Sequence, residues 1–201
     1  MEDMIDSTIR YYDNNSESYF NNTVSLDMNE LYSRFLIEIK PGGRIIDVGC
    51  GSGRDSKYFI NAGYEVVSID ASSEMCNVAS DYLQSPVSNM NVLDLKYKNK
   101  FDGVWACASL LHLPRINQYT ALDILVKSLK NNGILYASWK YGVNECSDGK
   151  RFFCNHTEDS LIEIINYLEN IEVIDIWKTD DKKQGNDIWI NLLLKKITSM
   201  N

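Results

Sequence analysis

The strongest constraint on the fold is an alternation of two kinds of segment that begins at Arg44. Short runs rich in β-branched residues alternate with longer amphipathic stretches, which is typical of βαβ units and a parallel sheet with right-handed crossovers. The expected strands are Arg44–Val48, Glu65–Ile69, Val87–Val92, Gly103–Ala106 and Ile134–Trp139. The expected helices are Asp55–Ala62, Ser73–Leu83 and Asn117–Lys130. The sequence therefore predicts an α/β fold.

The alternation stops after Trp139. Cys146–Asn155 shows no period and is expected to form an irregular loop. Thr157 is followed by two acidic residues, as at a helix N-cap, and predicts a helix that runs to about Glu169.

Two more strands are expected near the end of the chain, at Ile171–Lys178 and Asp187–Lys195. The polar segment Thr179–Asn186 joins them. Because a connection this short cannot make a parallel crossover, the two strands should form an antiparallel hairpin that closes the sheet edge.

The first forty residues differ from the rest. Met1–Lys40 carries two weakly amphipathic stretches, with tyrosines in a polar background. This segment is either a helical cap over the sheet or a packing arm. A chain of 201 residues is expected to form one structural domain. Within it, residues 1–40 would be the N-terminal helical cap and residues 41–201 the sheet domain.

The net charge and the hydropathy limit the classes of partner that the protein could bind. The net charge of −8 disfavours a protein that binds nucleic acid by displacing counterions from phosphates. No apolar run approaches the roughly 20 residues that span a bilayer. The first residues lack the basic start and the apolar middle of a signal peptide. We expect a cytoplasmic protein without nucleic-acid or membrane partners, as a monomer or homodimer.

Metal binding is not expected. The five cysteines are widely spaced and form no C-x-x-C pair, and only two histidines are present. The cysteines are interpreted as reduced, mostly packed thiols.

The segment after the first strand carries three glycines in five residues, Gly49, Gly51 and Gly53. In an open α/β sheet, ligands bind beyond the carboxyl ends of the strands, and glycine lets a ligand approach the backbone. A dinucleotide fingerprint has its last glycine where this chain has Arg54. Asp47, two residues before the first glycine, also fits a pyrophosphate poorly.

Two further acids follow the next two strands. Asp70 ends the second strand, where a carboxylate can accept hydrogen bonds from both ribose hydroxyls. Asp94 follows the third strand, where it could accept from an adenine amine. With Asp47, three carboxylates converge on one edge. Such an edge repels pyrophosphate and suits S-adenosylmethionine, which carries an ammonium and a sulfonium.

These motifs resemble those of the class I S-adenosylmethionine-dependent methyltransferases. Residues 47–53 read DVGCGSG, residues 68–70 read SID and residues 101–106 read FDGVWA. The run GCGSGRDS is similar to that of small-molecule methyltransferases of the tellurite-resistance and ubiquinone-biosynthesis kind. The resemblance implies a Rossmann-like fold, a mostly parallel seven-stranded sheet with a C-terminal antiparallel hairpin, and S-adenosylmethionine as the cofactor.

The resemblance also implies roles for individual residues. The three glycines would let the backbone approach the methionine part of the cofactor, while Asp47 would help place its ammonium. Asp70 would hold the ribose and Asp94 the adenine amine. The complete set expected at the cofactor is Tyr12, Asp47, Gly49, Cys50, Gly51, Gly53, Asp70, Ala71, Asp94 and Leu95. Asn132 stands where the turn before the fifth strand commonly has glycine, and asparagine tolerates the left-handed conformation.

The acceptor side is expected after the fourth and fifth strands. His112 lies where a side chain can face the transferred methyl group, so it is either a base or a residue that packs the next helix. Arg151 lies beside two phenylalanines and could clamp an anionic or planar acceptor, or belong to a solvated loop. The expected substrate residues are Tyr19, Ser109, His112, Lys140 and Arg151.

The function expected is methyl transfer to the oxygen, nitrogen or sulfur of a small molecule. The alternatives are a non-catalytic module that senses S-adenosylmethionine, and a methyltransferase that acts on RNA, DNA bases or protein. A dehydrogenase would need room for pyrophosphate. A sensor would need no second cavity beyond the methyl position.

Overall fold

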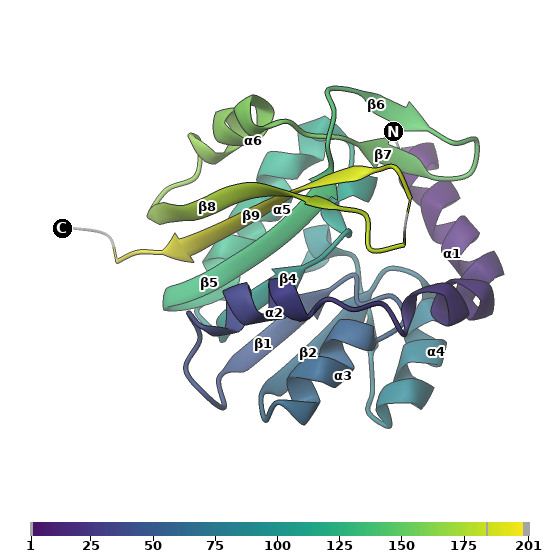
Figure 1. Cartoon of the computed structure of the whole chain (residues 1–201), viewed down its shortest axis with the longest axis horizontal. Helices are drawn as coiled ribbons and strands as arrows, with labels where there is room; N and C mark the ends of the chain where they lie inside the picture. The colour runs from purple at the N-terminus through teal and green to yellow at the C-terminus, as the bar shows by residue number, and fades with distance from the viewer. Residues whose placement is uncertain (1, 184, 199–201) are drawn as a thin grey trace.

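The computed structural model describes residues 2–183 and 185–198. A central sheet is covered by helices on both faces (Figure 1). In chain order, the elements are α1 (Glu2–Thr23), α2 (Asn29–Leu36), β1 (Arg44–Val48), α3 (Arg54–Asn61), β2 (Glu65–Asp70), α4 (Ser73–Leu83), β3 (Ser88–Asn89), η1 (Val92–Asp94), β4 (Phe101–Ala106), η2 (Leu110–His112), α5 (Arg115–Ser128), β5 (Leu129–Lys140), β6 (Glu145–Ser147), β7 (Phe152–Cys154), α6 (Glu158–Ile165), β8 (Ile171–Asp180) and β9 (Ile188–Lys196).

The large sheet has seven strands in the order β3-β2-β1-β4-β5-β9-β8. Strands β3, β2, β1, β4 and β5 pair in parallel, and β9 pairs antiparallel with both β5 and β8. The predicted mostly parallel sheet with a C-terminal hairpin is confirmed. The strand order reverses between β1 and β4, so a ligand site is expected at their carboxyl ends.

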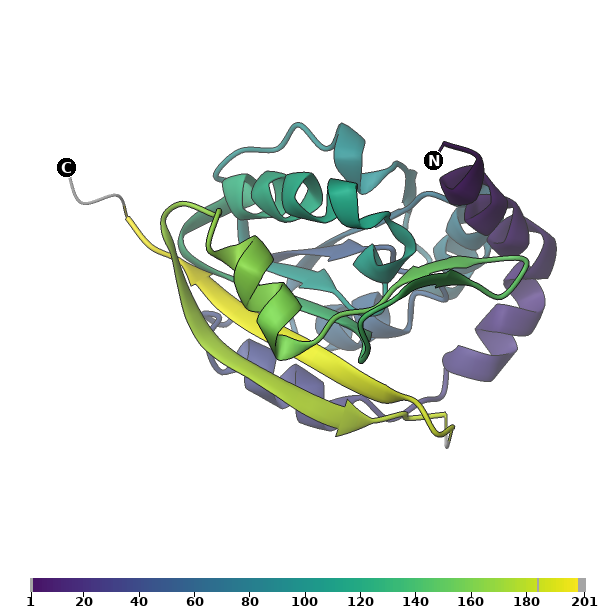
Figure 2. The ribbon, with the colours of Figure 1, turned by 90° about the horizontal axis from the view of Figure 1, so that it is seen from above.

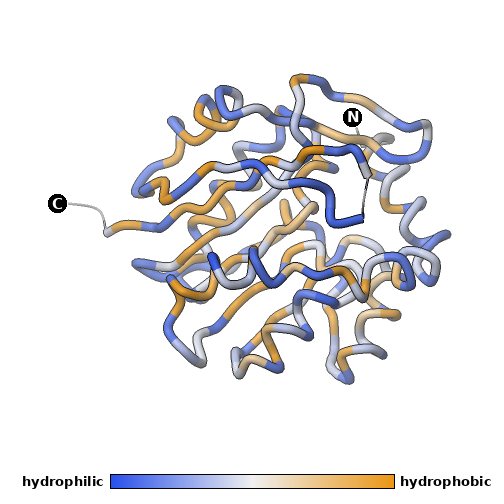
Figure 3. Tube along the Cα trace, viewed as in Figure 1, coloured by the Kyte–Doolittle hydropathy of each residue, from blue (hydrophilic) through white to orange (hydrophobic). Residues whose placement is uncertain are grey.

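Alternation along β1 divides the core in two. Ile45 and Ile46 are both fully buried, and they face opposite sides of the sheet. Ile45 packs in the cluster that contains Phe35 of α2 and Phe59 of α3. Ile46 belongs to the larger cluster that contains residues of α5 and α6. Hydrophobic stretches accordingly follow the strands through the middle of the molecule (Figure 3).

The chain from 146 to 155 was expected to be an irregular loop, and this is wrong. Residues 145–147 and 152–154 form a two-stranded antiparallel hairpin, β6–β7, in which Cys146 pairs with Phe153. The two strands differ in burial, because all three residues of β7 are buried and all three residues of β6 are exposed. The following helix ends at Ile165, earlier than expected.

The third expected strand, Val87–Val92, is mostly not a strand. Only Ser88 and Asn89 pair with β2, and the chain then turns into η1. The Asn91 side chain accepts a hydrogen bond from Leu93 N at 3.0 Å, which caps η1 and ends the extended segment. Asn132 does adopt the left-handed conformation, at φ +63°.

The first forty residues split into two parts. Helix α2 packs on the sheet through Leu31, Tyr32 and Phe35. Helix α1 instead crosses the edge of the molecule beside β6–β7 (Figures 1 and 2). It is kinked at Asn15, whose side-chain amide donates to the Tyr11 carbonyl at 2.7 Å. Within the described residues, no helix has the length and apolar character needed to cross a membrane.

Candidate active site

The glycine loop between β1 and α3 is shaped by close neighbours. Gly49 and Gly51 have φ of +69° and +52°. A Cβ on Gly49 would collide with the Ser109 side chain, and one on Gly51 would lie 3.2 Å from the Tyr19 ring. The positive φ favours glycine at both positions, and at Gly49 the space beside Ser109 requires it as well.

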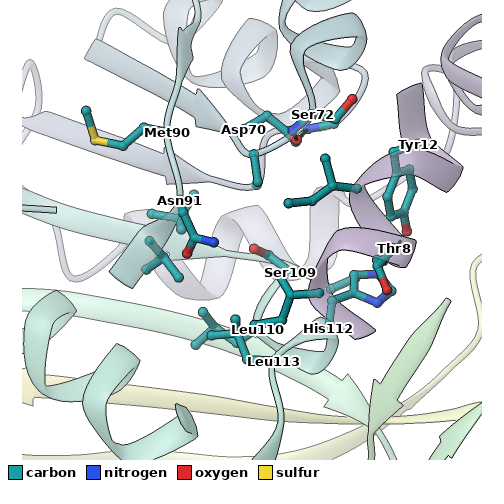
Figure 4. Close-up of a pocket in the computed structure, with 18 of the residues that line it drawn as sticks. Thr8, Tyr12, Asp70, Ser72, Met90, Asn91, Ser109, Leu110, His112 and Leu113 are labelled. Carbon is teal, nitrogen blue, oxygen red and sulfur yellow. Dashed lines mark hydrogen bonds between the residues drawn. The ribbon is translucent and has the colours of Figure 1, made fainter. Parts of the chain in front are cut away.

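Asp70 ends β2 and fastens the loop. One carboxylate oxygen accepts from Gly51 N and the other from Ser72 N, both at 2.9 Å. Burial raises the pKa of Asp70, and the backbone N–H groups that it binds oppose this rise. A first pocket, with a volume of about 100 Å³, opens beside this carboxylate (Figure 4). It is lined by Ile5, Thr8, Ile9, Tyr12, Tyr19, Val48, Gly49, Gly51, Asp70, Ala71, Ser72, Met90, Asn91, Val92, Ala108, Ser109, Leu110, His112 and Leu113.

Asn91 and Val92, rather than Asp94 and Leu95, line the first pocket. The short strand β3 and the turn at η1 place Asn91 on this wall, while Asp94 lies three residues further along η1. Asn91 was not among the site residues expected from the sequence. The available signal was an asparagine directly before a short helical turn, the position that such a residue caps.

Asp47 lies beneath the glycine loop and lines neither pocket. Ser56 Oγ donates to its carboxylate at 2.6 Å, and Ser56 Oγ lies 2.7 Å from Ser68 Oγ. Burial, followed by the nearby Asp55 charge, raises the pKa of Asp47 to about 8. Gly53 is also away from both walls and begins α3 with φ +77°, packed on Leu83.

A second pocket, with a volume of about 280 Å³, lies on the other side of Tyr12 and Tyr19. Its walls come from α1, the glycine loop, β5, β7 and the β8–β9 turn. They include Cys50, Arg54, Cys107, Tyr136, Ser138, Lys140, Arg151 and Phe153. Arg54 is held by its neighbour Asp55, through Nε at 2.6 Å and a terminal nitrogen at 3.0 Å.

The two pockets share part of their walls. The residues common to both are Tyr12, Tyr19, Gly49, Gly51, Ala108 and His112. Of the other expected site residues, Ala71 and Ser109 line the first pocket only, and Cys50, Lys140 and Arg151 line the second only. The pockets therefore meet at the Tyr12–His112 wall, which we call the junction.

His112 has a defined protonation state at the junction. Its Nδ1 lies 2.7 Å from the Phe152 carbonyl oxygen, which can only accept, so Nδ1 carries the hydrogen. Its Nε2 therefore accepts from the Tyr12 hydroxyl, at 2.8 Å. Burial lowers the pKa of His112 to about 4, so the ring is neutral near pH 7. Burial also raises the pKa of Tyr12, to about 12.

Helix α1 is fastened over the pockets at two places. Asp13 accepts from Ser72 Oγ at 2.6 Å and from Glu74 N at 3.2 Å, which ties α1 to the start of α4. Thr8 Oγ1 accepts from Phe152 N at 2.9 Å, which ties α1 to β7. The tyrosines that face the pockets are thus held by polar contacts on both sides of the site.

Within residues 2–183 and 185–198, no three His, Cys, Asp or Glu side chains are placed to share a metal ion. The first pocket is formed by the glycine loop, the Asp70 carboxylate, the Asn91 amide, and the rings of Tyr12 and His112.

Comparison with known proteins identifies a methyltransferase domain in the chain. A family model described as a methyltransferase domain matches residues 46–137, from β1 to β5. This segment of the chain is a methyltransferase domain. Structures that share this fold have been solved with S-adenosylmethionine or S-adenosylhomocysteine bound, and S-adenosylmethionine is the cofactor of this methyltransferase. The resemblance found in the motifs is confirmed.

Relatives agree with this family. An uncharacterized methyltransferase of Staphylococcus carnosus is 26% identical over 171 residues, which cover 80% of this chain and 77% of the relative. A ubiquinone biosynthesis O-methyltransferase of Xanthomonas campestris is 30% identical over 105 residues, covering 49% of this chain. This match spans only 43% of the Xanthomonas enzyme.

The fold is shared with solved structures. The 1,6-didemethyltoxoflavin-N1-methyltransferase of Burkholderia thailandensis superposes with a TM-score of 0.77 at 17% identity. The superposition covers 96% of this methyltransferase and 87% of that chain. At this identity the likeness concerns the fold.

Proposed function

We propose that this methyltransferase transfers the methyl group of S-adenosylmethionine to a small molecule held in the second pocket. The observation that carries the proposal is the junction, where one wall made by Tyr12 and His112 faces both pockets. A cofactor in the first pocket and an acceptor in the second would meet there. The names of the Xanthomonas and Burkholderia enzymes, both small-molecule methyltransferases, support this acceptor class.

The residues of the first pocket fit the parts of the cofactor. Asp70 offers carboxylate oxygens for ribose hydroxyls, and its position at the end of β2 is the one expected for that role. Asn91 offers an amide beside the apolar Met90 and Val92, which suits an adenine. Gly49 and Gly51 leave backbone exposed for the methionine part. Asp47 would act from beneath the loop, by holding its conformation through Ser56.

The bound cofactor supplies a methyl group on a sulfonium, and the chain chiefly has to align the acceptor atom with it. His112 presents an unprotonated Nε2 at the junction, oriented by the Phe152 carbonyl. It can accept a hydrogen bond from an acceptor hydroxyl or amine when Tyr12 yields its place. Helix α1 and β7 cover the junction and exclude water from it.

The second pocket favours catalysis over sensing. A protein that only senses the cofactor needs no space beyond the methyl position, whereas the second pocket offers about 280 Å³ there. The net charge of −8 supports a small molecule rather than nucleic acid.

The proposal is tested with S-adenosylmethionine that carries a radiolabelled methyl group. The enzyme is incubated with a metabolite fraction below about 1 kDa, and separately with total RNA and with protein from the same extract. We expect label only in the small-molecule fraction, and less of it with His112→Gln when both proteins are saturated with the cofactor. Label confined to RNA or protein would refute the acceptor class. Cofactor binding without transfer to any fraction would favour the sensor.

A further inference from the structure

We propose that the acceptor carries a carboxylate, which Arg151 and Lys140 bind beside Phe153 in the second pocket. This inference rests on the proposed function, because it assigns the chemistry of the acceptor to that site. The two cations come from different elements. Arg151 precedes β7 and Lys140 ends β5.

The two cations share one aromatic ring. The Arg151 guanidinium carbon and Lys140 Nζ each lie 5.0 Å from the centroid of the Phe153 ring. The His112 ring centroid lies 5.2 Å from the same ring. Arg151 also forms a hydrogen bond with Tyr12, so an anion bound by Arg151 lies near the junction. A short acceptor can reach both places.

Both cations keep donors for a ligand. Arg151 has five N–H groups. It donates to Asp148 through Nε at 3.1 Å and through one terminal nitrogen at 2.9 Å, and it also forms a hydrogen bond with the Tyr12 hydroxyl. Two N–H groups are then left for a ligand. Lys140 Nζ has three N–H donors and uses one of them to bind the Asp187 carboxylate, at 2.6 Å. Asp148 does not line the pocket, and the Asp187 side chain is 50% exposed, so its attraction for Lys140 is screened by solvent.

Basic side chains outnumber acidic ones on the wall of the second pocket, and the basic ones are Arg54, Lys140, Arg151, Lys182 and Lys183. Burial lowers the pKa of Lys183, the nearby Asp181 charge opposes this, and the charges of Arg151, Arg54 and Lys140 lower the pKa further. The acids on the pocket wall are Asp55, Asp180, Asp181 and Asp187. Of these, Asp55 is committed to Arg54, Tyr32 and Trp105. The remaining acids disfavour a phosphate dianion more than a carboxylate, which has a single charge.

The walls between the cations and the junction are aromatic. Tyr12, Tyr19, Tyr136 and Phe153 line the second pocket, and the Tyr12 and Tyr19 rings meet edge to face with centroids 5.1 Å apart. Such walls suit a planar ring. The acceptor class is therefore a small aromatic or otherwise planar carboxylate with a nucleophilic group on the side away from the carboxylate.

The test uses 3-hydroxybenzoate and its uncharged analogue 3-hydroxybenzamide as probes. Each is titrated calorimetrically into the protein saturated with S-adenosylhomocysteine. The variants are Arg151→Gln and Lys140→Gln, and the control is Lys150→Gln, which removes a neighbouring exposed charge outside both pockets. Circular dichroism and S-adenosylhomocysteine affinity check that each variant is folded.

We expect the benzoate to bind about 10-fold or more tightly than the benzamide, since it can form charge-assisted hydrogen bonds. Arg151→Gln and Lys140→Gln should each remove most of this preference, and Lys150→Gln should keep it. Equal binding of the two probes, binding of neither, or a preference that survives in both pocket variants would overturn the carboxylate site. Tighter binding of phenyl phosphate would also overturn it.

These outcomes are distinct from a failure of the proposed function. A protein that binds S-adenosylhomocysteine but does not prefer the benzoate remains a methyltransferase with a different acceptor. A protein that binds no S-adenosylhomocysteine overturns both proposals.

Discussion

Asp70 receives backbone hydrogen bonds from both segments that border the first pocket, through Gly51 N and Ser72 N. We predict that Asp70→Ala weakens S-adenosylhomocysteine binding by about 1.5–3 kcal/mol, because it removes an acceptor for the ribose and frees the loop. Calorimetry measures the difference. Asp102→Ala is the matched control, since Asp102 also accepts a backbone N–H, from Arg44, but lines neither pocket. Equal affinity in Asp70→Ala and the parent would remove Asp70 from the site.

His156 gives a prediction about stability that is independent of catalysis. It is fully buried, and burial lowers its pKa to about 4. The unfolded chain binds a proton at the ordinary histidine pKa, so the folded state loses relative stability as the pH falls from about 7 to about 5. The parent should lose about 2 kcal/mol more than His156→Gln over this range.

Urea unfolding at the two pH values measures this difference. Comparison with the variant cancels the contributions of His112 and Asp47, which also titrate away from their ordinary values. A parent and variant with the same pH dependence would show that His156 has the same pKa in the folded and unfolded states.

The positions of single site residues could be predicted from the sequence where the residues directly follow a clearly marked strand. Gly49, Gly51 and Asp70 follow well-marked strands, and all three line the first pocket. Asn91 was missed because the third strand is only two residues long, so counting from an expected strand selected Asp94. The partners of His112 come from residues 12 and 152, which no local pattern connects.

Helix α1 is the element that closes the site, and we propose that the sheet domain folds without its first part. Removing residues 1–20 should leave the circular dichroism spectrum of a folded α/β domain, because α2 and the large sheet are retained. Cofactor binding should weaken and turnover should nearly vanish, because Tyr12 and Tyr19 are lost from the junction.

The point variant Tyr12→Phe is the matched control for this deletion. It removes the hydroxyl that donates to His112 and keeps the ring that packs on Tyr19. Turnover should therefore fall less than in the truncated protein. A folded truncation with unchanged cofactor affinity and turnover would show that α1 only packs on the domain.

Helices and strands whose apolar residues recur at a regular spacing could be predicted from the sequence. Those that depend on contacts between residues far apart in the chain could not. Expected and observed bounds agree for Arg44–Val48 and Ser73–Leu83. The β6–β7 hairpin was predicted as a loop because its order comes from the burial of Phe152 and Phe153 and from contact with Thr8 of α1. Such contacts join residues about 144 positions apart and leave no local pattern.

At the scale of the whole molecule, the sheet topology brings the site together. Residues 12, 70, 112 and 151 lie far apart in the sequence and converge at the carboxyl edge where strand order reverses. The sequence predicted this edge and the cofactor, because both follow from strand order and the glycine loop. The acceptor pocket depends on how α1, β7 and the β8–β9 turn meet, which sequence patterns do not specify.

The most direct test of the account is a crystal structure of the protein with S-adenosylhomocysteine. The account predicts the ribose against Asp70, the adenine beside Asn91, and the sulfur at the junction facing Tyr12, His112 and the second pocket. A ligand bound elsewhere, or bound with its sulfur directed away from the second pocket, would contradict the proposal that the two pockets hold cofactor and acceptor.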